Sequence, residues 1–412
     1  MINKFIHNKS YRLCILTLLI TIFSGLEWSG FSNTTMTWIV DFIFVYILFQ
    51  YKNQSKTDIL INIYLTWLLL GTIRGIFIVE NYWEWKQLIT GFLSLSIPMF
   101  IYPFQYCKNT QTVLSFWIKY AIPLFVIFLF FLPNGSYHFY LGPIFLLGCF
   151  LSFLSKRWKI IIGGLLLLMF FSNLDARSQV IKASITILIA IGIYFSRYIP
   201  YTLIKIVHAI CYIIPIILLS LGISGTFNIF QDLSKNEGKY METKIVNGQV
   251  IESDLSTDTR TFIYEEVIES ALNHNYVICG RTPARGNDSV AFGSHIAEEL
   301  KTGKYERHAN ELCHTNVFTW LGLIGVMLYS LIYLKSSYLA VYKSNNIYIK
   351  ILGCYIAFRW AYGWIEDMNR FNIMNISLWM IIAMGLSSQF RQMNDMEFKL
   401  WVKTIFNKKI KL

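Results

Sequence analysis

Residues 206–225 read IVHAICYIIPIILLSLGISG, and this stretch contains no Lys, Arg, Asp or Glu. An α-helix needs about 20 predominantly apolar residues in succession to cross the hydrocarbon core of a bilayer. Similar stretches lie on both sides of it, and with 206–225 they number twelve: 11–29, 35–50, 58–79, 87–103, 114–132, 138–154, 159–174, 178–195, 206–225, 315–334, 349–365 and 371–388. We therefore expect an all-α, polytopic membrane protein with about 12 transmembrane helices.

The composition excludes an ordinary soluble globular protein. Of the 412 residues, 55% are hydrophobic and 17% aromatic, whereas only 15% are charged. A soluble domain carries roughly 25% charged residues. The formal net charge is +12, from 36 Lys+Arg and 24 Asp+Glu. In a membrane protein such an excess indicates cytoplasmic loops rather than a nucleic-acid partner, because basic residues are enriched on the cytoplasmic side.

The basic residues also predict the orientation. Lys4, Lys9 and Arg12 precede the first apolar stretch, and residues 391–412 form a basic tail. An even number of spans returns the chain to its starting side, so we expect both termini in the cytoplasm. The predicted organisation has four parts: transmembrane helices 1–9 in 1–225, a large outside loop in 226–313, transmembrane helices 10–12 in 314–390, and the cytoplasmic tail in 391–412.

The outside loop is acidic and is expected to fold. It carries 9 Lys+Arg and 14 Asp+Glu, and a loop of this length without regular structure would be unusual. We expect a helix that starts at about 256–258 and ends near Asn273, and a second helix over about 294–302. Residues 280–286, GRTPARG, indicate a turn between them. The loop is predicted to form a small cap or lid.

Charged side chains inside apolar stretches are costly and are candidates for function. Arg74, Arg177 and Arg359 stand near the outer ends of their stretches, and the loop adds Arg260. Guanidinium groups suit bidentate binding of phosphate oxygens and stay charged when partly desolvated. The alternative is structural ion pairs: Arg74 with Glu80, Arg177 with Asp175, and Arg359 with Glu366 or Asp367.

His314 stands where the loop enters the tenth span, at the depth expected for these arginines. Glu311 precedes it by three residues, within reach of the imidazole on a helical turn. A histidine held by a carboxylate can act as the general base that activates a hydroxyl, although a simple interfacial histidine is the alternative. His308 and His314 are six residues apart and do not share a helical face, which fails the pattern of a zinc-protease helix.

Of the seven cysteines, only Cys279 and Cys313 lie in the outside loop. In an oxidising compartment this pair could close a disulfide that anchors the loop beside His314.

The arrangement resembles the O-antigen polymerase and O-antigen ligase superfamily of bacterial envelope glycosyltransferases. The topology is similar over the whole chain, and three short motifs carry the resemblance at the residue level. They are DARSQ at 175–179, an Arg-Ser step at the outer start of a helix; TRTFIY at 259–264, with a glycine turn over 280–286; and ELCHTN at 311–316, leading to the Gly-x-x-Gly of 322–325.

The resemblance implies glycosyl transfer, without metal or cofactor, at the periplasmic face of the bacterial inner membrane. The donor would be a glycan on undecaprenyl diphosphate, and the acceptor a repeat unit or lipid A core. Arg177 and Arg260 would bind the diphosphate, with Arg74 and Arg359 as helpers.

In the same reading, His314 would take the proton from the acceptor hydroxyl, with Glu311 as its orienting partner or substitute. A chain-length regulator is a further expected partner. The competing prediction is a transporter or lipid-linked oligosaccharide flippase, since twelve spans with both ends inside also describe many carriers.

Overall fold

The computed structural model describes residues 9–27, 29–30, 33–52, 58–174, 176–224, 241–246, 249–254, 260–301 and 303–406. Within these ranges, eight helical segments are long and apolar enough to cross a membrane. They are α2 (Lys9–Leu26), α3 (Thr34–Lys52), α4 (Ile59–Ile76), the segment Tyr82–Phe104, α7 (Cys107–Phe128), α11 (Arg177–Tyr194), α12 (Tyr201–Ile223) and α16 (Cys313–Tyr342). The prediction of an all-α protein with several membrane-spanning helices is confirmed at this level.

The segment Tyr82–Phe104 is interrupted. It consists of α5 (Tyr82–Leu95), the 3₁₀-helix η1 (Ile97–Phe100) and α6 (Ile101–Phe104). Pro98 stands in the first turn of η1, where its missing N–H costs no hydrogen bond. The chain therefore changes helix type at the proline and continues in the same stretch.

The four other predicted spans form shorter elements. Residues 138–154 form most of α8 (Tyr137–Tyr140), α9 (Pro143–Gly148) and η3 (Leu151–Phe153) in place of one helix, and η2 (Asn134–Ser136) directly precedes them. The other three become α10 (Lys156–Phe171), α17 (Ile347–Tyr362) and α18 (Ile373–Leu386). The break between α8 and α9 has a packing reason. A Cβ atom at Gly142 would lie 2.4 Å from the Cα of Met374, so the backbones of α9 and α18 meet there.

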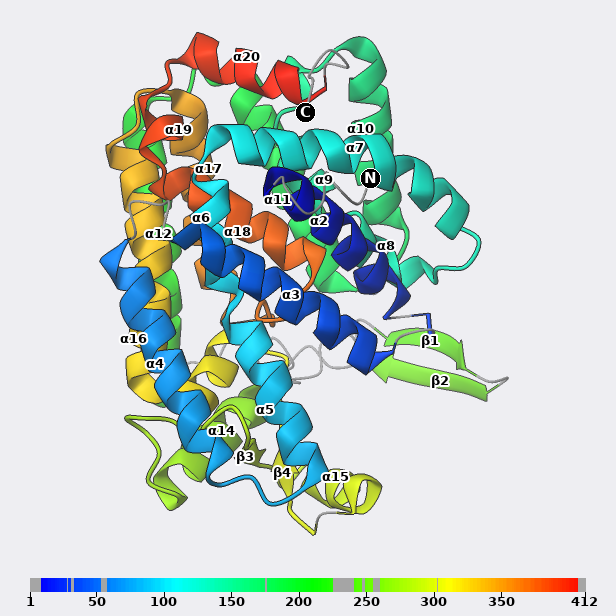
Figure 1. The fold of residues 1–412 in the computed structure, drawn as a ribbon, viewed down its shortest axis with the longest axis vertical. Helices are drawn as coiled ribbons and strands as arrows, with labels where there is room; N and C mark the ends of the chain where they lie inside the picture. The colour runs from blue at the N-terminus through cyan, green and yellow to red at the C-terminus, as the bar shows by residue number, and fades with distance from the viewer. Residues whose placement is uncertain are drawn as a thin grey trace.

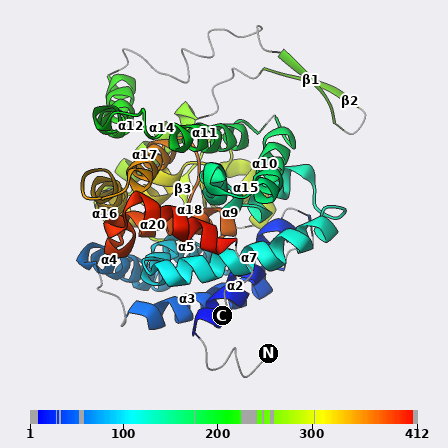
Figure 2. The ribbon, with the colours of Figure 1, turned by 90° about the horizontal axis from the view of Figure 1, so that it is seen from above.

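α18 is the centre of the molecule (Figure 2). Every residue from Ile373 to Gly385 is buried, and its 14 residues extend over only about 21 Å at 1.5 Å per residue. A helix this short would not cross the hydrocarbon core of a bilayer on its own, which is about 30 Å thick. The surrounding protein buries it instead, and the Asn372 side chain caps its start by accepting a hydrogen bond from the backbone N–H of Asn375.

The part of the large loop from residue 260 onward forms a layer at one end of the molecule, whereas the hairpin before it projects from the side (Figure 1 and Figure 2). The described elements of the loop are the hairpin β1 (Met241–Val246) and β2 (Gln249–Asp254), α14 (Thr261–Asn273), β3 (Asn287–Asp288), α15 (Gly293–Leu300) and β4 (Glu306–Arg307). In Figure 1, α14, α15, β3 and β4 occupy the lower end, while α19 (Ser388–Gln392) and α20 (Asp395–Ile405) lie at the upper end. The helix predicted over 294–302 agrees with α15, and α14 ends at the predicted Asn273. The predicted helix start at 256–258 lies outside the described residues.

α16 is kinked where the loop enters it. Gly322 has a φ of 69° and a ψ of −169°, which breaks the helix. The freed N–H of Leu323 donates to the carbonyl of Val277 at 2.9 Å, and the Leu321 carbonyl accepts from the Trp67 indole at 2.9 Å. Because these backbone groups find new partners, the break is tolerated in an apolar helix. It also fastens the loop to the transmembrane part of the chain.

Candidate functional site

Several predicted site residues meet at residues 360–367, the last residues of α17 and the segment after them, which we call the α17 turn. The backbone N–H groups of Cys313 and His314 donate to the carbonyl of Gly363 at 3.0 and 3.3 Å. The His314 imidazole reaches the same turn, with its Nε2 3.0 Å from the carbonyl oxygen of Trp360. The start of α16 is thus held against the end of α17.

This hydrogen bond defines the tautomer of His314. A carbonyl oxygen can only accept, so Nε2 carries the proton and Nδ1 holds the free lone pair. Nδ1 is buried and has no hydrogen-bond partner among the described residues. The side chain is 2% exposed, and its ring centre lies 4.4 Å from that of Trp364 and 5.6 Å from that of Trp360. The basic atom of His314 therefore faces an aromatic, water-poor environment.

The loop arginine binds the same turn. Arg260 stands immediately before α14, and its Nε donates to the carbonyl of Ile365 at 3.1 Å. One turn further along α14, the hydroxyl of Tyr264 donates to the carbonyl of Trp364. Two side chains of the loop therefore cover the α17 turn from outside.

A buried cluster of charged side chains lies at the α17 turn. Lys182 of α11 contacts Glu366 with its Nζ 2.6 Å from Oε1, and Arg359 of α17 approaches the second oxygen with its Nη2 4.0 Å from Oε2. The side chains of Lys182 and Arg359 are 1% and 2% exposed. Two cations and one carboxylate leave the cluster with a net positive charge. We call Lys182, Arg359 and Glu366 the buried triad.

The hydrogen bonding of the triad is incomplete. Nε and Nη2 of Arg359 and Oε2 of Glu366 are buried without a hydrogen-bond partner in the part of the chain that the structure describes. Asp367, the next residue, pairs with Arg370 at 3.6 Å instead, and burial raises its pKa. A buried cation without full compensation is costly, so the triad is suited to receive an additional anion.

Arg177 begins α11 and is exposed. Lys182 follows it by five residues, which is about 7.5 Å along a helix axis. Arg177 therefore lies further toward the end of the same helix that contributes Lys182 to the triad. Its predicted partner Asp175 lies outside the described residues.

Arg74 has a different environment. Its Nη1 and Nη2 donate to the carbonyls of Cys279 and Gly280 at 3.0 and 3.1 Å. Glu80, the expected partner, pairs with Lys304 at 2.6 Å instead. Arg74 therefore anchors the loop segment that enters the α16 kink, and its contacts are with this segment rather than with the α17 turn.

Glu311 is also placed apart from the predicted contact. Its side chain is 64% exposed and pairs with Arg307 at 3.5 Å, whereas the imidazole of His314 hydrogen-bonds to Trp360. The orienting group of His314 in the structure is thus a backbone carbonyl.

The predicted disulfide between Cys279 and Cys313 is not formed, and both described thiols are free. Gly280, next to Cys279, packs against the backbone of residues 320–322. Cys313 begins α16 at least seven residues earlier, roughly 10 Å along the axis. This separation exceeds what a disulfide can bridge. The thiol of Cys313 lies 3.3 Å from Oδ1 of Asn369 instead.

Sequence reasoning did not find the ion-pair network that holds the loop. Arg285 pairs with Glu306, and Arg281 contacts Glu306 at 3.1 Å and Asp288 at 2.9 Å. Lys304 pairs with Glu84, a 1% exposed residue of α5. The signal was the near-equal number of acidic and basic residues in this part of the loop, which indicates pairing but not which residues pair. The network connects the loop to α5 and is structural.

Comparisons with known proteins leave the function to be argued from this geometry. No family model matches the chain, and searches of curated proteins and of solved structures find no match either.

Proposed function

We propose that the protein transfers a glycan from a lipid diphosphate to a sugar hydroxyl, as the polymerases and ligases of O-antigen do. The buried triad supports this proposal most directly. It carries a net positive charge, two guanidinium nitrogens of Arg359 have no hydrogen-bond partner among the described residues, and it adjoins the turn that contacts His314 and Arg260. Groups of this kind stabilise a leaving diphosphate, because preplaced cations in a low-dielectric site favour the charge that develops in the transition state.

In this proposal the buried triad and the arginines at the outer side bind different parts of the donor diphosphate. Arg359 binds a diphosphate oxygen through the Nε and Nη2 atoms that are otherwise unpartnered within the described residues, and Glu366 retains Lys182. Arg260 and Arg177 approach from the outer side, and Arg74 assists by holding the loop in place. No metal is needed for this role, since the guanidinium groups supply the positive charge.

The chemical step is a substitution at the anomeric carbon. The acceptor oxygen bonds to this carbon, the bond from carbon to the diphosphate oxygen breaks, and the electron pair leaves with the lipid diphosphate. Nδ1 of His314 takes the hydroxyl proton, while its Nε2–H bond to Trp360 keeps the ring oriented. Glu311, on the preceding turn, is the alternative acceptor of this proton.

The buried position of these groups requires a movement. His314 and Arg359 are each 2% exposed, so substrates reach them only when the α17 turn shifts away from α16. Loop contacts through Arg260 and Tyr264 hold this turn. The loop is therefore proposed to act as a lid whose release opens the site.

The membrane arrangement belongs to the same proposal. All twelve apolar stretches lie within the bilayer of the bacterial inner membrane, with the short helices shielded by the longer ones. The loop faces the periplasm and both termini face the cytoplasm. In support, α20, with its Lys399 and Lys403, lies at the end of the molecule opposite to α14 and α15 (Figure 1). A repeat unit or lipid A core is the acceptor, and a chain-length regulator is a plausible partner.

The proposal is tested with purified protein and a lipid-diphosphate-linked repeat unit. We expect release of lipid diphosphate and a longer or transferred glycan, and we expect Arg359→Gln to lose both products while the protein stays folded. Lys399→Gln at the opposite end is the matched control and keeps full activity. Movement of the intact substrate across a liposome bilayer, without covalent change, would instead support a flippase. The buried Lys182–Glu366 pair is the feature that favours this second candidate.

A further inference from the structure

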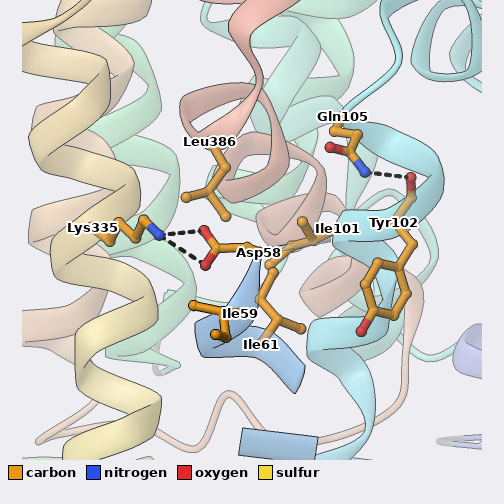
Figure 3. A pocket seen from close by; sticks show the side chains of 8 residues that line it. All are labelled: Asp58, Ile59, Ile61, Ile101, Tyr102, Gln105, Lys335 and Leu386. Atoms are coloured by element: carbon orange, nitrogen blue, oxygen red, sulfur yellow. Dashed lines mark hydrogen bonds and ion pairs between the residues drawn. The ribbon is translucent and has the colours of Figure 1, made fainter. Parts of the chain in front are cut away.

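A separate cavity lies away from the α17 turn, where the ends of several helices meet (Figure 3). Its volume is about 310 Å³. Asp58 is the N-cap of α4, Gln105 directly follows α6, and Leu386 is the last residue of α18. Lys335 lies on α16, about two helical turns before its end. In the proposed membrane arrangement, the start of α4 and the end of α6 mark the boundary between the apolar core and the headgroups, which places the cavity at headgroup depth.

Two opposite charges stand at this cavity. The Nζ atom of Lys335 is 2.8 Å from both Oδ1 and Oδ2 of Asp58, and the side chains are 42% and 18% exposed. Asp58 is held in place because it also accepts from the backbone N–H of Leu60 at 3.1 Å. A partly exposed ion pair contributes little to stability, so a ligand can replace the contact at small cost. A ligand with one charge would meet one favourable and one repulsive partner, whereas a zwitterion suits both.

Gln105 adds a hydrogen-bond acceptor. Its Nε2 donates to the carbonyl of Tyr102 at 3.1 Å. Since a carbonyl only accepts, this bond orients the amide, and its oxygen is left on the cavity side (Figure 3). A cavity lined by both a carboxylate and an amide oxygen favours a primary ammonium group, which has three N–H donors, over a quaternary ammonium, which has none.

Apolar residues flank the cavity on the outer surface. Ile59 and Ile63 of α4 are 72% and 48% exposed, and Leu331 and Leu334 of α16 are 42% and 41% exposed. The two helices pack against each other, so these residues form neighbouring apolar rows that acyl chains can cover. The cavity volume is at the lower end of small-molecule sites, roughly 300–1,000 Å³. It fits a small headgroup rather than an oligosaccharide.

We infer that this cavity binds the headgroup of a zwitterionic phospholipid that carries a primary ammonium. The phosphodiester pairs with Lys335, the ammonium binds Asp58 and the amide oxygen of Gln105, and the acyl chains lie along α4 and α16. This site is independent of the proposed transferase activity.

The test measures lipid binding to the purified, delipidated full-length protein by native mass spectrometry. The probes are phosphatidylethanolamine, phosphatidylcholine and phosphatidylglycerol with identical acyl chains. We expect the ethanolamine lipid to bind more tightly than the other two by about threefold or more, the scale of a partly exposed ion pair. Equal affinity for the three lipids would overturn the inference.

Variants separate the charge from the fold. Asp58→Asn keeps the helix cap, because Asn caps as well as Asp, and it should abolish the preference for the ethanolamine lipid. Lys335→Gln should weaken all three lipids, while Lys343→Gln, at the same end of α16 but outside the cavity, should change none. An Asp58→Asn protein that keeps the preference would refute the assignment. Water-soluble glycerophosphoethanolamine should not compete at equal concentration, and effective competition would refute a lipid as the ligand.

Discussion

The hydrogen bond from His314 to Trp360 makes the proposed base testable without disturbing its surroundings. A glutamine at this position carries an amide N–H that can replace Nε2–H, but it has no basic nitrogen. We expect His314→Gln to lower the rate of glycan transfer by about 10²- to 10⁴-fold, the usual contribution of general-base catalysis, with little change in donor binding. The measurement is single-turnover transfer alongside donor retention. A normal rate in this variant would remove His314 from the mechanism.

Glu366 balances two buried cations. The substitution Glu366→Gln leaves Lys182 and Arg359 without their carboxylate partner. We expect it to lower the free energy of unfolding by about 3–5 kcal/mol, because it leaves buried charge uncompensated. The double variant Lys182→Met/Glu366→Gln restores the original net charge and should recover much of this loss. Thermal unfolding in detergent measures both proteins. Equal stability of the single variant and the native protein would contradict the electrostatic account of the triad.

At the scale of single residues, the sequence predicted which charged side chains are buried at a cost better than it predicted their contacts. An ion pair of Arg359 with Glu366 or Asp367 was one of the two expected alternatives, and Arg359 does approach Glu366. Lys182 could not be assigned to Glu366 because 184 residues separate them. Glu311 was three residues from His314, but its exposed side chain contacts Arg307. Local spacing predicts which contacts are possible, whereas tertiary packing decides which are formed.

Among the elements, α16 depends on one glycine. The φ of Gly322 is 69°, and a Cβ atom there would lie 2.2 Å from the carbonyl oxygen of Ile278. We expect Gly322→Ala to destabilise the protein by more than about 1–3 kcal/mol, since a positive φ with an extended ψ is essentially restricted to glycine and alone costs another residue this much. Gly163→Ala is the matched control, because Gly163 lies in α10 with open space around its Cα. Thermal unfolding in detergent compares the two variants. Equal melting of both would show that the kink tolerates a side chain.

The ion pairs that hold the loop predict a dependence on pH. Burial alone would raise the pKa of Glu306, but the hydrogen bond from Arg285 and the charge of Arg281 hold it below its usual value. A carboxyl with a lowered pKa stabilises the fold above its unfolded pKa, about 4.3, and this stability is lost as the pH falls through the lowered folded pKa.

We therefore expect Glu306→Gln to melt earlier than the native protein at pH 7, with the difference shrinking as the pH falls below about 4.3 and through the lowered pKa of Glu306. Melting temperatures measured across this range in detergent check the prediction. A difference that persists unchanged at acid pH would show that packing, rather than charge, accounts for the effect of the substitution.

The length of an apolar stretch predicts some of the helices correctly and fails for others. The long apolar stretches became long helices, because an apolar run without charged residues has few other stable structures in lipid. The stretch 138–154 broke, since Gly142 meets the backbone at Met374, a contact 232 positions away that no local pattern reveals. α18 came out short because protein, rather than lipid, surrounds it.

Over the whole molecule, the helices differ in how much of their apolar surface other helices cover. α12 leaves many large apolar side chains exposed, among them Ile213 and Ile216 at 52% and 56%, whereas α18 is buried throughout. Exposed apolar surface of this extent is expected to contact lipid. The hydrophobic residues therefore predicted the membrane, and the length of the loop predicted that it folds, but neither predicted which helix would be central.

The proposed topology is tested at the two ends of the molecule. Leu272 of α14 is 63% exposed and Met396 of α20 is 68% exposed. In cells with a permeabilised outer membrane, we expect a membrane-impermeant maleimide to modify Leu272→Cys. Met396→Cys should react only after the inner membrane is opened. The native protein, with its seven cysteines, provides the background. Labelling of both sites from the same side would refute opposite placement of the loop and α20.

The position of α18 has a consequence for biogenesis. It follows most of its packing partners in the sequence, yet it occupies the middle of the finished molecule. The helices synthesised before it must therefore leave a vacant slot until the ribosome has released enough chain to fill it. Nascent chains that stop before residue 373 would expose the walls of that slot, which makes them natural targets for membrane proteases.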